Sequence, residues 1–252
     1  MENITSNQNK RIKNIIALQT KSKTRKENAS FVVEGPKMVR EASGLSLLRE
    51  VFMTEKYMNE DFACECFCVP DKLMKEISGT ETPQGIVGIC DFPTHPPLED
   101  ILAKPRLRLL ILEDVRDPGN LGTMIRTSEA AGIDAVIMSK GTADMYSPKV
   151  TRSTMGSIFR VPCYYTDDLQ EVLKSLKAAG IVTYAAHLKG EKFHSEIEYP
   201  AKCGVIIGNE ANGITDETTS LAGELIKIPM EGKVESLNAA IAAAIMMYAM
   251  KS

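Results

Sequence analysis

The 252-residue sequence predicts an α/β protein in which a parallel sheet, covered by helices on both faces, follows a smaller α/β half. Two observations indicate this class. Short runs of β-branched and aliphatic residues alternate with helix-like stretches along the second half of the chain. These runs are apolar at nearly every position, which is typical of strands that are buried on both faces of a parallel sheet.

The first half mixes short strands with amphipathic helices. In residues 9–21, isoleucines recur at helical spacing with lysines on the other side, which predicts a helix. Pro36 begins a second helix in the position where its missing N–H does no harm. The remaining segments of this half are predicted as strands or helices from their residue types and from the turn residues that flank them. The expected strands are residues 31–34, 51–54, 63–69 and 85–90, and the expected helices are residues 9–21, 36–42 and 71–78.

Four prolines within residues 92–105 predict a semi-rigid linker between two domains. We therefore divide the chain into a first domain (1–92), a linker (93–105) and a second domain (106–252). The expected strands of the second domain are residues 107–112, 135–138, 181–186, 203–208 and 225–228, and its expected helices are residues 121–131, 148–157, 168–179, 215–222 and 236–250.

The composition is that of an ordinary folded protein with a local excess of positive charge. Apolar residues make up 44% of the chain and charged residues 25%. No apolar run approaches the roughly 18 residues of a membrane span, and the N-terminus does not look like a secretion signal. Residues 1–40 contain nine basic and three acidic residues, a local charge of +6, although the whole chain carries −3. This distribution favours a polyanion partner, but a solvated helix face with spare lysines explains it equally well.

The cysteines and histidines do not form a metal-binding pattern. Cys64, Cys66 and Cys68 alternate, so on a strand they would share one face as small buried residues. No CxxC or HxxxH spacing supplies further ligands, and we expect no metal. The cysteine usage predicts a reducing cytoplasm. The three histidines lie outside the polar stretches described next, which disfavours a histidine nucleophile.

Three polar stretches with glycines follow expected strands, where a core would need apolar bulk. They are residues 117–126, 206–213 and 228–238. Loops at the carboxyl ends of parallel strands share one edge of the sheet, so we expect them to form one ligand site. No G-x-G-x-x-G motif follows the first strand of the second half, and no G-x-x-x-x-G-K-[ST] motif occurs. A dinucleotide site and a P-loop are therefore poorly supported.

The first stretch contains two residues that also have ordinary structural explanations. Asn120 suits a helix cap. Arg126, six residues later on the same helix, could form a surface ion pair with Glu129 or Glu113.

The polar residues of the other two stretches also have ordinary structural explanations. Glu210 could cap the helix that is expected near Thr215. Ser236 is a natural N-cap for the Ala-rich last helix. Asn238 would then lie inside that helix, where asparagine is unfavourable unless it has a partner.

As an ordered set, residues 117–126, 206–213 and 228–238 resemble the three signature motifs of the SpoU (TrmH-like) RNA ribose methyltransferases of the SPOUT superfamily. Residues 31–42 and 81–86 resemble the substrate-binding domain of that family, which is similar to small ribosomal RNA-binding proteins. The resemblance implies transfer of a methyl group from S-adenosylmethionine to a ribose 2′-hydroxyl in RNA, with ribosomal RNA favoured over transfer RNA. It also implies a C-terminal trefoil knot that forms the cofactor pocket, and a homodimer formed through the catalytic domain.

The family's residue roles carry over position by position. The implied catalytic residues are Arg126, Asn120, Glu210, Ser236 and Asn238. The implied cofactor-binding residues are Gly208, Asn209, Gly213, Ile228, Met230, Ser236, Leu237 and Asn238. Because a guanidinium is a poor base, Arg126 would bind the phosphate beside the target ribose and stabilise the developing alkoxide.

The basic N-terminal region and the stretch around residues 147–156 would supply the RNA contacts. The expected RNA-binding residues are Lys10, Arg11, Lys13, Lys23, Arg25, Lys37 and Arg152. The alternative function is a catalytically inactive RNA-binding or assembly module of the same fold, against which the intact polar residues argue. The N-x-G-x-x-x-R pattern disfavours methylation of a base nitrogen, and the basic N-terminal domain disfavours a small-molecule substrate.

Overall fold

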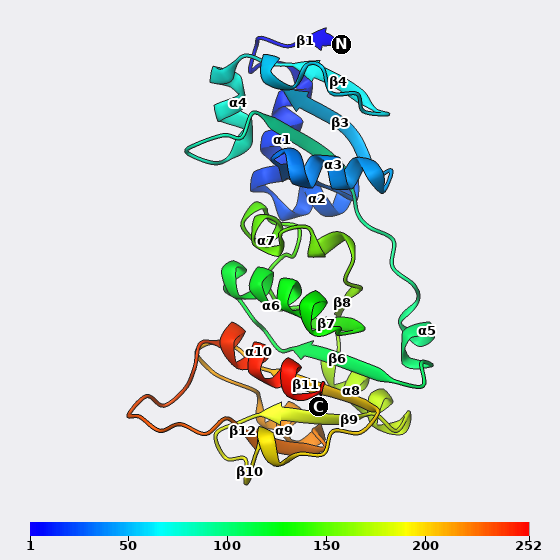
Figure 1. The fold of residues 1–252 in the computed structure, drawn as a ribbon, viewed down its shortest axis with the longest axis vertical. Coiled ribbons are helices and arrows are strands. Elements are labelled where there is room, and N and C mark those ends of the chain that lie inside the picture. The colour runs from blue at the N-terminus through cyan, green and yellow to red at the C-terminus, as the bar shows by residue number, and fades with distance from the viewer. Residues whose placement is uncertain (252) are drawn as a thin grey trace. The chain divides into compact units, whose positions relative to one another are not determined.

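The computed structural model describes residues 1–251, which form two compact units (Figure 1). The first unit comprises residues 1–94 together with residues 144–159. The second comprises residues 95–143 and the chain from residue 160 onward. Residues 144–159 fall inside the second domain as divided by sequence, so the compact units do not follow a linear division of the chain.

The first unit is built on a five-stranded mixed sheet. Its strands are β1 (Glu2–Asn3), β2 (Ser30–Glu34), β3 (Leu48–Met53), β4 (Glu65–Cys68) and β5 (Ile86–Asp91). Across the sheet they are ordered β1-β4-β3-β5-β2; β5 is antiparallel to both neighbours and the other pairs are parallel. The helices of this unit are α1 (Lys10–Thr20), α2 (Ser22–Asn28), α3 (Pro36–Gly44), α4 (Asp71–Ser78) and α7 (Pro148–Thr154), with 3-10 turns at Glu55–Tyr57 and Ser157–Phe159.

The apolar spacing of α1 explains how it packs. Ile12, Ile15 and Leu18 are fully buried in the core of the first unit, and the side chain of Asn9 caps the helix. Helix α2 is not predicted by the sequence, because its residues Ser-Lys-Thr-Arg-Lys-Glu-Asn contain no apolar position from which a period could be read.

The second unit contains the predicted parallel sheet, with seven strands. They are β6 (Leu107–Leu112), β7 (Ala135–Ser139), β8 (Cys163–Thr166), β9 (Val182–Ala186), β10 (Lys192–Phe193), β11 (Lys202–Ile207) and β12 (Glu224–Lys227). Their order is β10-β12-β9-β11-β6-β7-β8, and every pair is parallel. The central strand β6 is buried on both faces: Leu109, Leu110, Ile111 and Leu112 are all fully buried.

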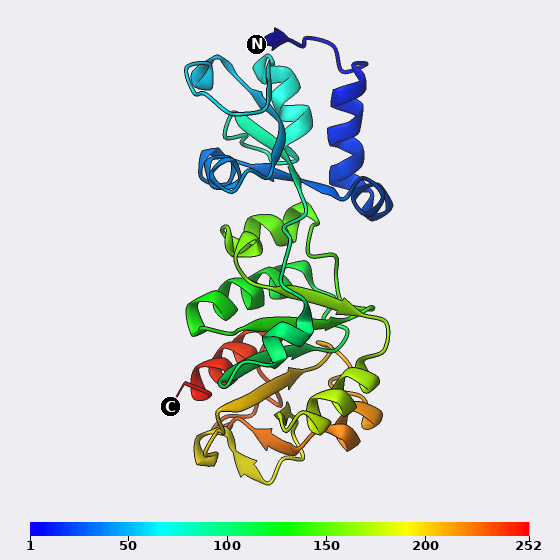
Figure 2. The ribbon, with the colours of Figure 1, turned by 90° about the vertical axis from the view of Figure 1, so that its right-hand side faces the viewer.

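Helices cover both faces of this sheet, as predicted. They are α5 (Leu98–Leu102), α6 (Pro118–Ala131), α8 (Leu169–Ala178), α9 (Asp216–Leu221) and α10 (Ala239–Ala249), with a 3-10 turn at His194–Glu196. Figure 2 shows α6 and α10 on one side of the sheet and α8 and α9 on the other.

Several elements of the second unit differ from the sequence prediction, among them the two-residue strand β10, which the sequence does not predict. The segment predicted as a linker contains α5, which buries Ile101 in the core of the second unit. Strand β8 has only four residues, two of them half-buried and one exposed, so the apolar pattern does not reveal it. The last helix begins at Ala239 rather than at Ser236. Among the described residues, no helix is long and apolar enough to span a bilayer.

Candidate functional site

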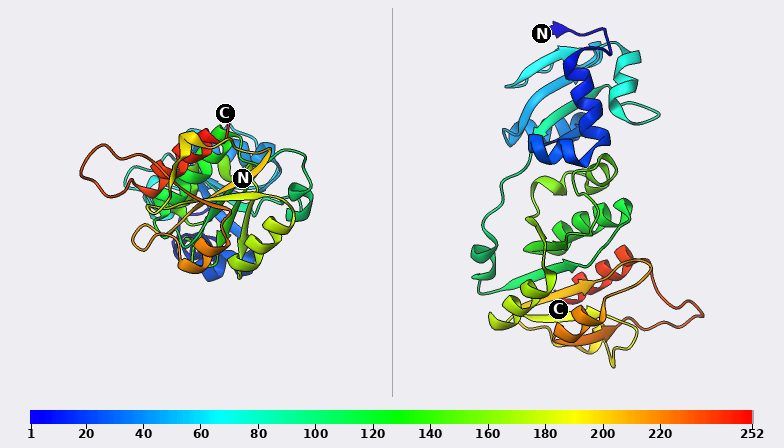
Figure 3. Two further views of the ribbon diagram at one scale, coloured as in Figure 1. Left: turned by 90° about the horizontal axis from the view of Figure 1, so that it is seen from below. Right: turned by 180° about the vertical axis from the view of Figure 1, so that it is seen from behind.

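The three polar stretches lie at the carboxyl edge of the seven-stranded sheet. Residues 113–117 follow β6, residues 208–215 follow β11, and residues 228–238 follow β12. Because these strands are parallel, the three loops leave the sheet at one edge, which is where open α/β sheets bind ligands. Figure 3 shows the loop between β12 and α10, in orange, extending away from the rest of the second unit.

The turn after β11 is closed by its own backbone. Asn209 and Gly213 exchange two backbone hydrogen bonds of 3.0 and 2.9 Å. A Cβ atom on Gly208 would lie 2.3 Å from the carbonyl carbon of Gly213, so only glycine allows this close approach. The side chain of Asn209 donates to the backbone carbonyl of Asp114 at 2.7 Å. These bonds fix the shape of the turn and attach it to the end of β6.

Glu210 joins this turn to the start of α6. Its carboxylate accepts hydrogen bonds from the backbone N–H groups of Arg116 and Asp117, each at 3.1 Å, and from Nδ2 of Asn120 at 3.0 Å. Burial alone would raise the pKa of Glu210, but these hydrogen bonds, led by that from Asn120, lower the pKa below its ordinary value. Glu210 does not cap α9, because Thr215 occupies that N-cap position.

Asn120 connects Glu210 to the third loop. The Nδ2 group of Asn238 donates to Oδ1 of Asn120 at 2.9 Å. Asn120 itself lies in the first turn of α6, and the N-cap is Asp117, whose side chain accepts from the Asn120 N–H at 2.8 Å. The predicted capping role of Asn120 is therefore wrong, and its side chain instead bonds to both loops. We call Asn120, Glu210 and Asn238 the polar cluster.

The N-cap of α10 is a second correction. The Oδ1 atom of Asn238 accepts from the backbone N–H groups of Ala240 and Ile241, so Asn238 caps the helix and does not lie inside it. Ser236, predicted as this cap, is exposed, and its side chain makes no hydrogen bond within residues 1–251.

Arg126 lies on α6 with an exposed side chain. The surface ion pairs that would give it a structural role are not formed. Glu129 instead binds Arg160 through a bond of 2.9 Å, and buried Glu113 accepts from Thr215 at 2.7 Å. Within the described chain, Arg126 has no hydrogen bond or ion pair, so its guanidinium can bind an anion.

The remaining predicted cofactor residues lie along the third loop. All are half-buried or exposed: Ile228, Met230, Ser236 and Leu237. Two large apolar side chains at the same edge are unusually exposed, Leu188 after β9 at 67% and Val234 in the third loop at 62%. Exposed apolar surface around a polar loop suits a ligand that has an apolar face.

Arg25, a predicted RNA-binding residue, is only 4% exposed. Its Nε and Nη2 atoms donate to the Asp144 carboxylate at 3.0 and 2.7 Å, and Nη1 donates to the backbone carbonyls of Leu18 and Gln19. Its guanidinium therefore links α2 to Asp144 by an ion pair within the first unit. The sequence prediction for Arg25 is corrected, because a buried and paired side chain cannot reach RNA.

Arg11 is also engaged within the first unit. Its guanidinium bonds to Glu50 and, at 3.0 and 3.1 Å, to Glu65, and it lies 4.4 Å from the ring centre of Phe67. Two carboxylates thus neutralise its charge locally. The predicted lysines are all exposed: Lys10, Lys13, Lys23 and Lys37.

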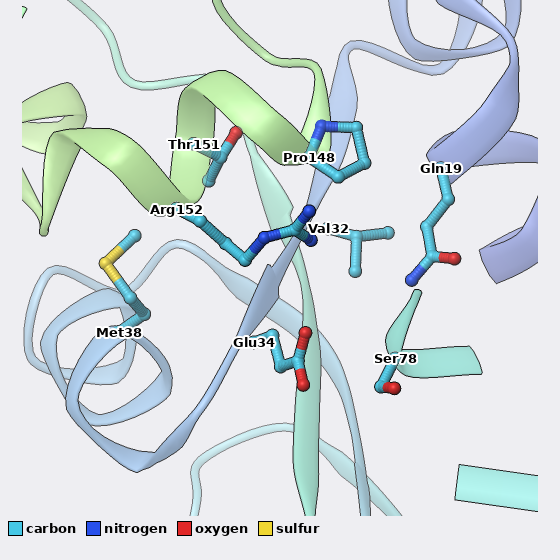
Figure 4. A pocket seen from close by; sticks show the side chains of 8 residues that line it. All are labelled: Gln19, Val32, Glu34, Met38, Ser78, Pro148, Thr151 and Arg152. Atoms are coloured by element: carbon cyan, nitrogen blue, oxygen red, sulfur yellow. The ribbon is translucent and has the colours of Figure 1, made fainter. Parts of the chain in front are cut away.

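Arg152 lies on α7, which belongs to the first unit. Figure 4 shows its side chain reaching toward Val32 in a small pocket that is also lined by Glu34 and Gln19. Burial raises the pKa of Glu34, and a hydrogen bond of 2.8 Å from Thr80 opposes this effect. Arg152 is exposed and adds positive charge beside this carboxylate.

A cavity of about 260 Å³, not anticipated from the sequence, lies beside the polar cluster in the second unit. Its walls come from the loops after β6, β7, β8 and β11 and include Asp114, Arg116 and Lys140. Of the predicted site residues, only Asn209 and Gly213 line it. The available signal was the charged run Glu-Asp-Val-Arg at residues 113–116, directly after an apolar strand.

Metal ligands are not gathered at these sites. Among residues 1–251, no group of three or more His, Cys, Asp or Glu side chains could hold a metal ion. The six cysteines are all free thiols.

Comparison with known families identifies the chain. Residues 108–248 match the SpoU rRNA Methylase family, and residues 9–88 match the MRM3-like substrate binding domain. This chain belongs to the SpoU rRNA methylase family.

Relatives match over nearly the whole length. The chain is 34% identical to the 23S rRNA (guanosine(2553)-2′-O)-methyltransferase RlmP of Bacillus subtilis, over 98% of both chains. It is 33% identical to the 23S rRNA (guanosine-2′-O-)-methyltransferase RlmB of Neisseria meningitidis, over 86% of both. The AdoMet-bound rRNA methyltransferase from Sinorhizobium meliloti superposes with a TM-score of 0.90 at 33% identity, over 99% of this chain and 97% of that one.

The function implied by the three motifs is therefore confirmed. The protein is an S-adenosylmethionine-dependent RNA 2′-O-ribose methyltransferase, and ribosomal RNA is the supported substrate class. The relatives do not support the inactive RNA-binding module or a transfer RNA substrate.

Proposed function

We propose that this SpoU family enzyme methylates the 2′-hydroxyl of a guanosine in 23S rRNA in the cytoplasm. The names of the relatives from Bacillus subtilis and Neisseria meningitidis both specify a guanosine of 23S rRNA, and the first aligns with 98% of this chain. The free cysteines agree with a reducing compartment. The observation that carries the mechanism is the hydrogen-bonded polar cluster, together with Arg126, which lies on the same helix as Asn120 and has no hydrogen bond or ion pair within residues 1–251.

In the proposed mechanism, Arg126 binds the phosphate next to the target ribose and stabilises negative charge on the attacking oxygen. A guanidinium keeps its proton, so it acts by charge and by a bidentate fork rather than as a base. S-adenosylmethionine, when bound, would supply an electrophilic sulfonium methyl group for the 2′-hydroxyl oxygen, with S-adenosylhomocysteine as the leaving group. The hydroxyl proton passes to solvent or to the bound phosphate.

The polar cluster orders the loops for this reaction. Glu210 holds the backbone N–H groups at the start of α6 and orients Asn120 at 3.0 Å, and Asn238 donates to the same asparagine at 2.9 Å. The three loops are thus joined into one network before substrate binds. Such preorganisation holds the reacting atoms in line and lowers the entropic part of the barrier.

The residues of the second and third loops fit the cofactor. The closed turn at Gly208, Asn209 and Gly213 offers a narrow backbone edge, and Asn238, the N-cap of α10, is linked to this turn through Asn120 and Glu210. Half-buried Ile228, Met230 and Leu237 would contact the adenine, and exposed Leu188 and Val234 would cover it. Ser236 would contact the cofactor from the same loop.

We propose that the C-terminal segment forms a trefoil knot around this pocket. Strand β12 lies beyond β9 in the sheet, whereas the next helix, α10, packs against α6 and β11. The chain therefore doubles back across β9 after leaving the sheet, as a knotted return requires. The TM-score of 0.90 to a solved rRNA methyltransferase supports this path.

We also propose a homodimer formed through the catalytic domain, with α10 at the interface. This helix is almost entirely apolar, yet Ile241 is 51% exposed and Tyr248 49% exposed, and Ile245 lies between them on the same side. A second copy would bury this apolar stripe.

Residues 1–92 would bind the RNA. The family model of a substrate-binding domain covers residues 9–88. Four exposed lysines lie on its first three helices: Lys10 and Lys13 on α1, Lys23 on α2 and Lys37 on α3. Lysines that keep their solvent exposure attract the phosphate backbone. Exposed Arg152 on α7 adds to this charge.

The test is methyl transfer from labelled S-adenosylmethionine to total RNA, followed by nuclease digestion and separation of the nucleosides. The wild type should label 2′-O-methylguanosine in 23S rRNA. Arg126→Ala should lower the rate at least about 100-fold, as loss of a charge-stabilising donor does, while cofactor affinity stays within about twofold.

The matched control is Arg106→Ala, which removes an exposed arginine just before β6, at the opposite edge of the sheet. This variant should methylate RNA normally. Wild-type turnover by Arg126→Ala would refute the proposed role, and label in a nucleoside other than 2′-O-methylguanosine would refute the proposed target.

A further inference from the structure

The cavity of about 260 Å³ in the second unit has the size and polarity of a binding site for one nucleobase. It opens at the carboxyl edge of the sheet, among the loops that follow β6, β7, β8 and β11. None of the three members of the polar cluster lines it, and only two of the residues assigned to the cofactor do. The cavity is therefore distinct from the proposed cofactor pocket.

One wall carries a carboxylate that is held in a fixed position. Asp114 has a left-handed backbone with φ of 53°, which is uncommon outside glycine. Its N–H donates to Oγ of Ser139 at 2.8 Å, and the same hydroxyl donates to its Oδ1 at 2.7 Å. A Cβ atom on Gly141 would lie 2.2 Å from Oδ1, so the neighbouring loop also requires glycine to accommodate this carboxylate.

The other oxygen of Asp114 retains hydrogen-bonding capacity. Its partner is the Nη2 atom of Arg116 at 3.4 Å, a long bond to a side chain that is 70% exposed. The side chain of Asp114 is itself 38% exposed. A preorganised acceptor beside a cavity, with only a long hydrogen bond from an exposed arginine, suits a ligand that brings its own N–H donors.

Cationic side chains stand next to this carboxylate. Arg116 and Lys140 both line the cavity and are 70% and 79% exposed. Lys140 pairs with Asp167 at 2.9 Å, but both side chains are largely exposed, so this pair is weak. The cavity therefore offers an acceptor for N–H groups together with exposed cationic donors for a carbonyl oxygen or a phosphate.

The cavity is also adjacent to the proposed reaction centre. The backbone N–H of Arg116, a residue of the cavity wall, donates to Glu210 at 3.1 Å. Asn209, another wall residue, directly precedes Glu210 in the chain. A base is attached to the sugar carbon next to the one that bears the 2′-hydroxyl, so a ribose at the polar cluster brings its base to this wall.

We propose that this cavity binds the guanine base of the nucleotide that is methylated, with Asp114 as the residue that selects guanine. The N1–H and N2–H groups of guanine donate to the Asp114 carboxylate, while Arg116 or Lys140 donates to O6. Adenine presents an unprotonated N1 at the same edge and is repelled by a carboxylate. The inference rests on the proposed guanosine target, and it assigns the choice of base to the catalytic domain.

The test measures binding of the mononucleotides 5′-GMP, AMP, CMP and UMP to the full-length protein by NMR titration. Saturating S-adenosylmethionine keeps the nucleotides out of the cofactor pocket. A pair of hydrogen bonds to a charged acceptor predicts that GMP binds at least about tenfold more tightly than AMP. Inosine monophosphate, which lacks the N2 amine, should bind several-fold more weakly than GMP.

Asp114→Asn should reduce the preference for GMP to within about twofold. Asparagine adopts the left-handed backbone readily and keeps an oxygen for Ser139, so the loop should fold normally. The matched control, Asp100→Asn, removes the same charge from an exposed position on α5 that does not line the cavity, and should keep the preference. With rRNA as substrate, Asp114→Asn should raise KM and leave kcat nearly unchanged.

Equal affinity of the wild type for the four nucleotides, or equal affinity for GMP and inosine monophosphate, would overturn the proposal. A purely structural Asp114 would lower thermal stability in Asp114→Asn without changing the base preference, which would overturn it as well. If rRNA is methylated normally while GMP shows no preference, only this inference fails. If GMP is preferred but no RNA is methylated, only the proposed function fails.

Discussion

The polar cluster of the second unit and the arginines of the first unit use polar groups in opposite ways. Asn120, Glu210 and Asn238 come from distant parts of the chain and bond to one another at a loop-lined edge. Arg11 and Arg25 bond instead to carboxylates of their own unit, and Arg25 is buried. The carboxyl ends of parallel strands lie at one edge of the sheet, so the sequence order of the strands predicts that these residues meet. A local count of charges, in contrast, does not predict which arginines form ion pairs within the protein and which can bind RNA.

The sharpest test of this difference is the stability of the first unit. Arg25→Met should lower the free energy of unfolding by about 3 kcal/mol, because it leaves Asp144 without its buried partner. Lys23→Met, on the same helix but 86% exposed, should change it by less than about 0.5 kcal/mol. Calorimetric unfolding of both variants measures this, and equal stability would mean that the buried pair contributes nothing.

Much of the fold follows from apolar periodicity, and the exceptions have physical causes. The central strands of the second unit are apolar at nearly every position, so their pattern is explicit in the sequence. Helix α2 has no apolar residue, and it is stabilised by the Arg25–Asp144 pair, which joins residues 119 positions apart. Such a pair cannot be read from sequence spacing.

The site was predictable at the level of loops but not of contacts. The three stretches identify the edge of the sheet and the residues that meet there. Which residue caps a helix depends on a shift of two or three positions, as Asn238 and Asp117 demonstrate. The cavity at Asp114 depends on the loops after β7 and β8, and β8 itself has no strong apolar pattern.

The caps provide the next test. Asn238→Ala should destabilise the second unit by about 1 kcal/mol, because it removes the N-cap of α10. It should also lower methyl transfer, since Asn120 loses a partner at 2.9 Å. Ser236→Ala should leave stability within about 0.5 kcal/mol of the wild type. Thermal unfolding of both variants decides between them; a larger loss from Ser236→Ala would restore the cap predicted from sequence.

A smaller loss of stability is expected when the pH is lowered, because Glu210 then becomes protonated. The pKa of Glu210 is lower in the folded protein than in the unfolded chain, so its stabilising contribution is complete above about pH 4.3 and disappears as pH falls through the lowered value. Amide exchange at Arg116 and Asp117, whose N–H groups donate to Glu210, should show this loss of protection. Glu210→Gln should remove the pH dependence at both amides. A wild-type profile without any acid transition would contradict this role.

The smallest effect concerns the lysines that remain available. Lys23 pairs with Glu27 at 3.7 Å, but the two side chains are 86% and 62% exposed, so the pair is weak and its charge can be shared with RNA. If Lys23 and Lys37 each contact one phosphate, each change to alanine should weaken rRNA binding a few-fold. Each should also reduce the slope of log affinity against log salt by about 0.7 to 0.9.

Lys174→Ala, on α8 of the second unit, is the control for general charge and should leave the slope unchanged. An unchanged slope for Lys23→Ala and Lys37→Ala would mean that the basic N-terminal segment is only a solvated surface. The RNA contacts would then have to come from the catalytic unit, where Arg126 has no protein partner among the described residues.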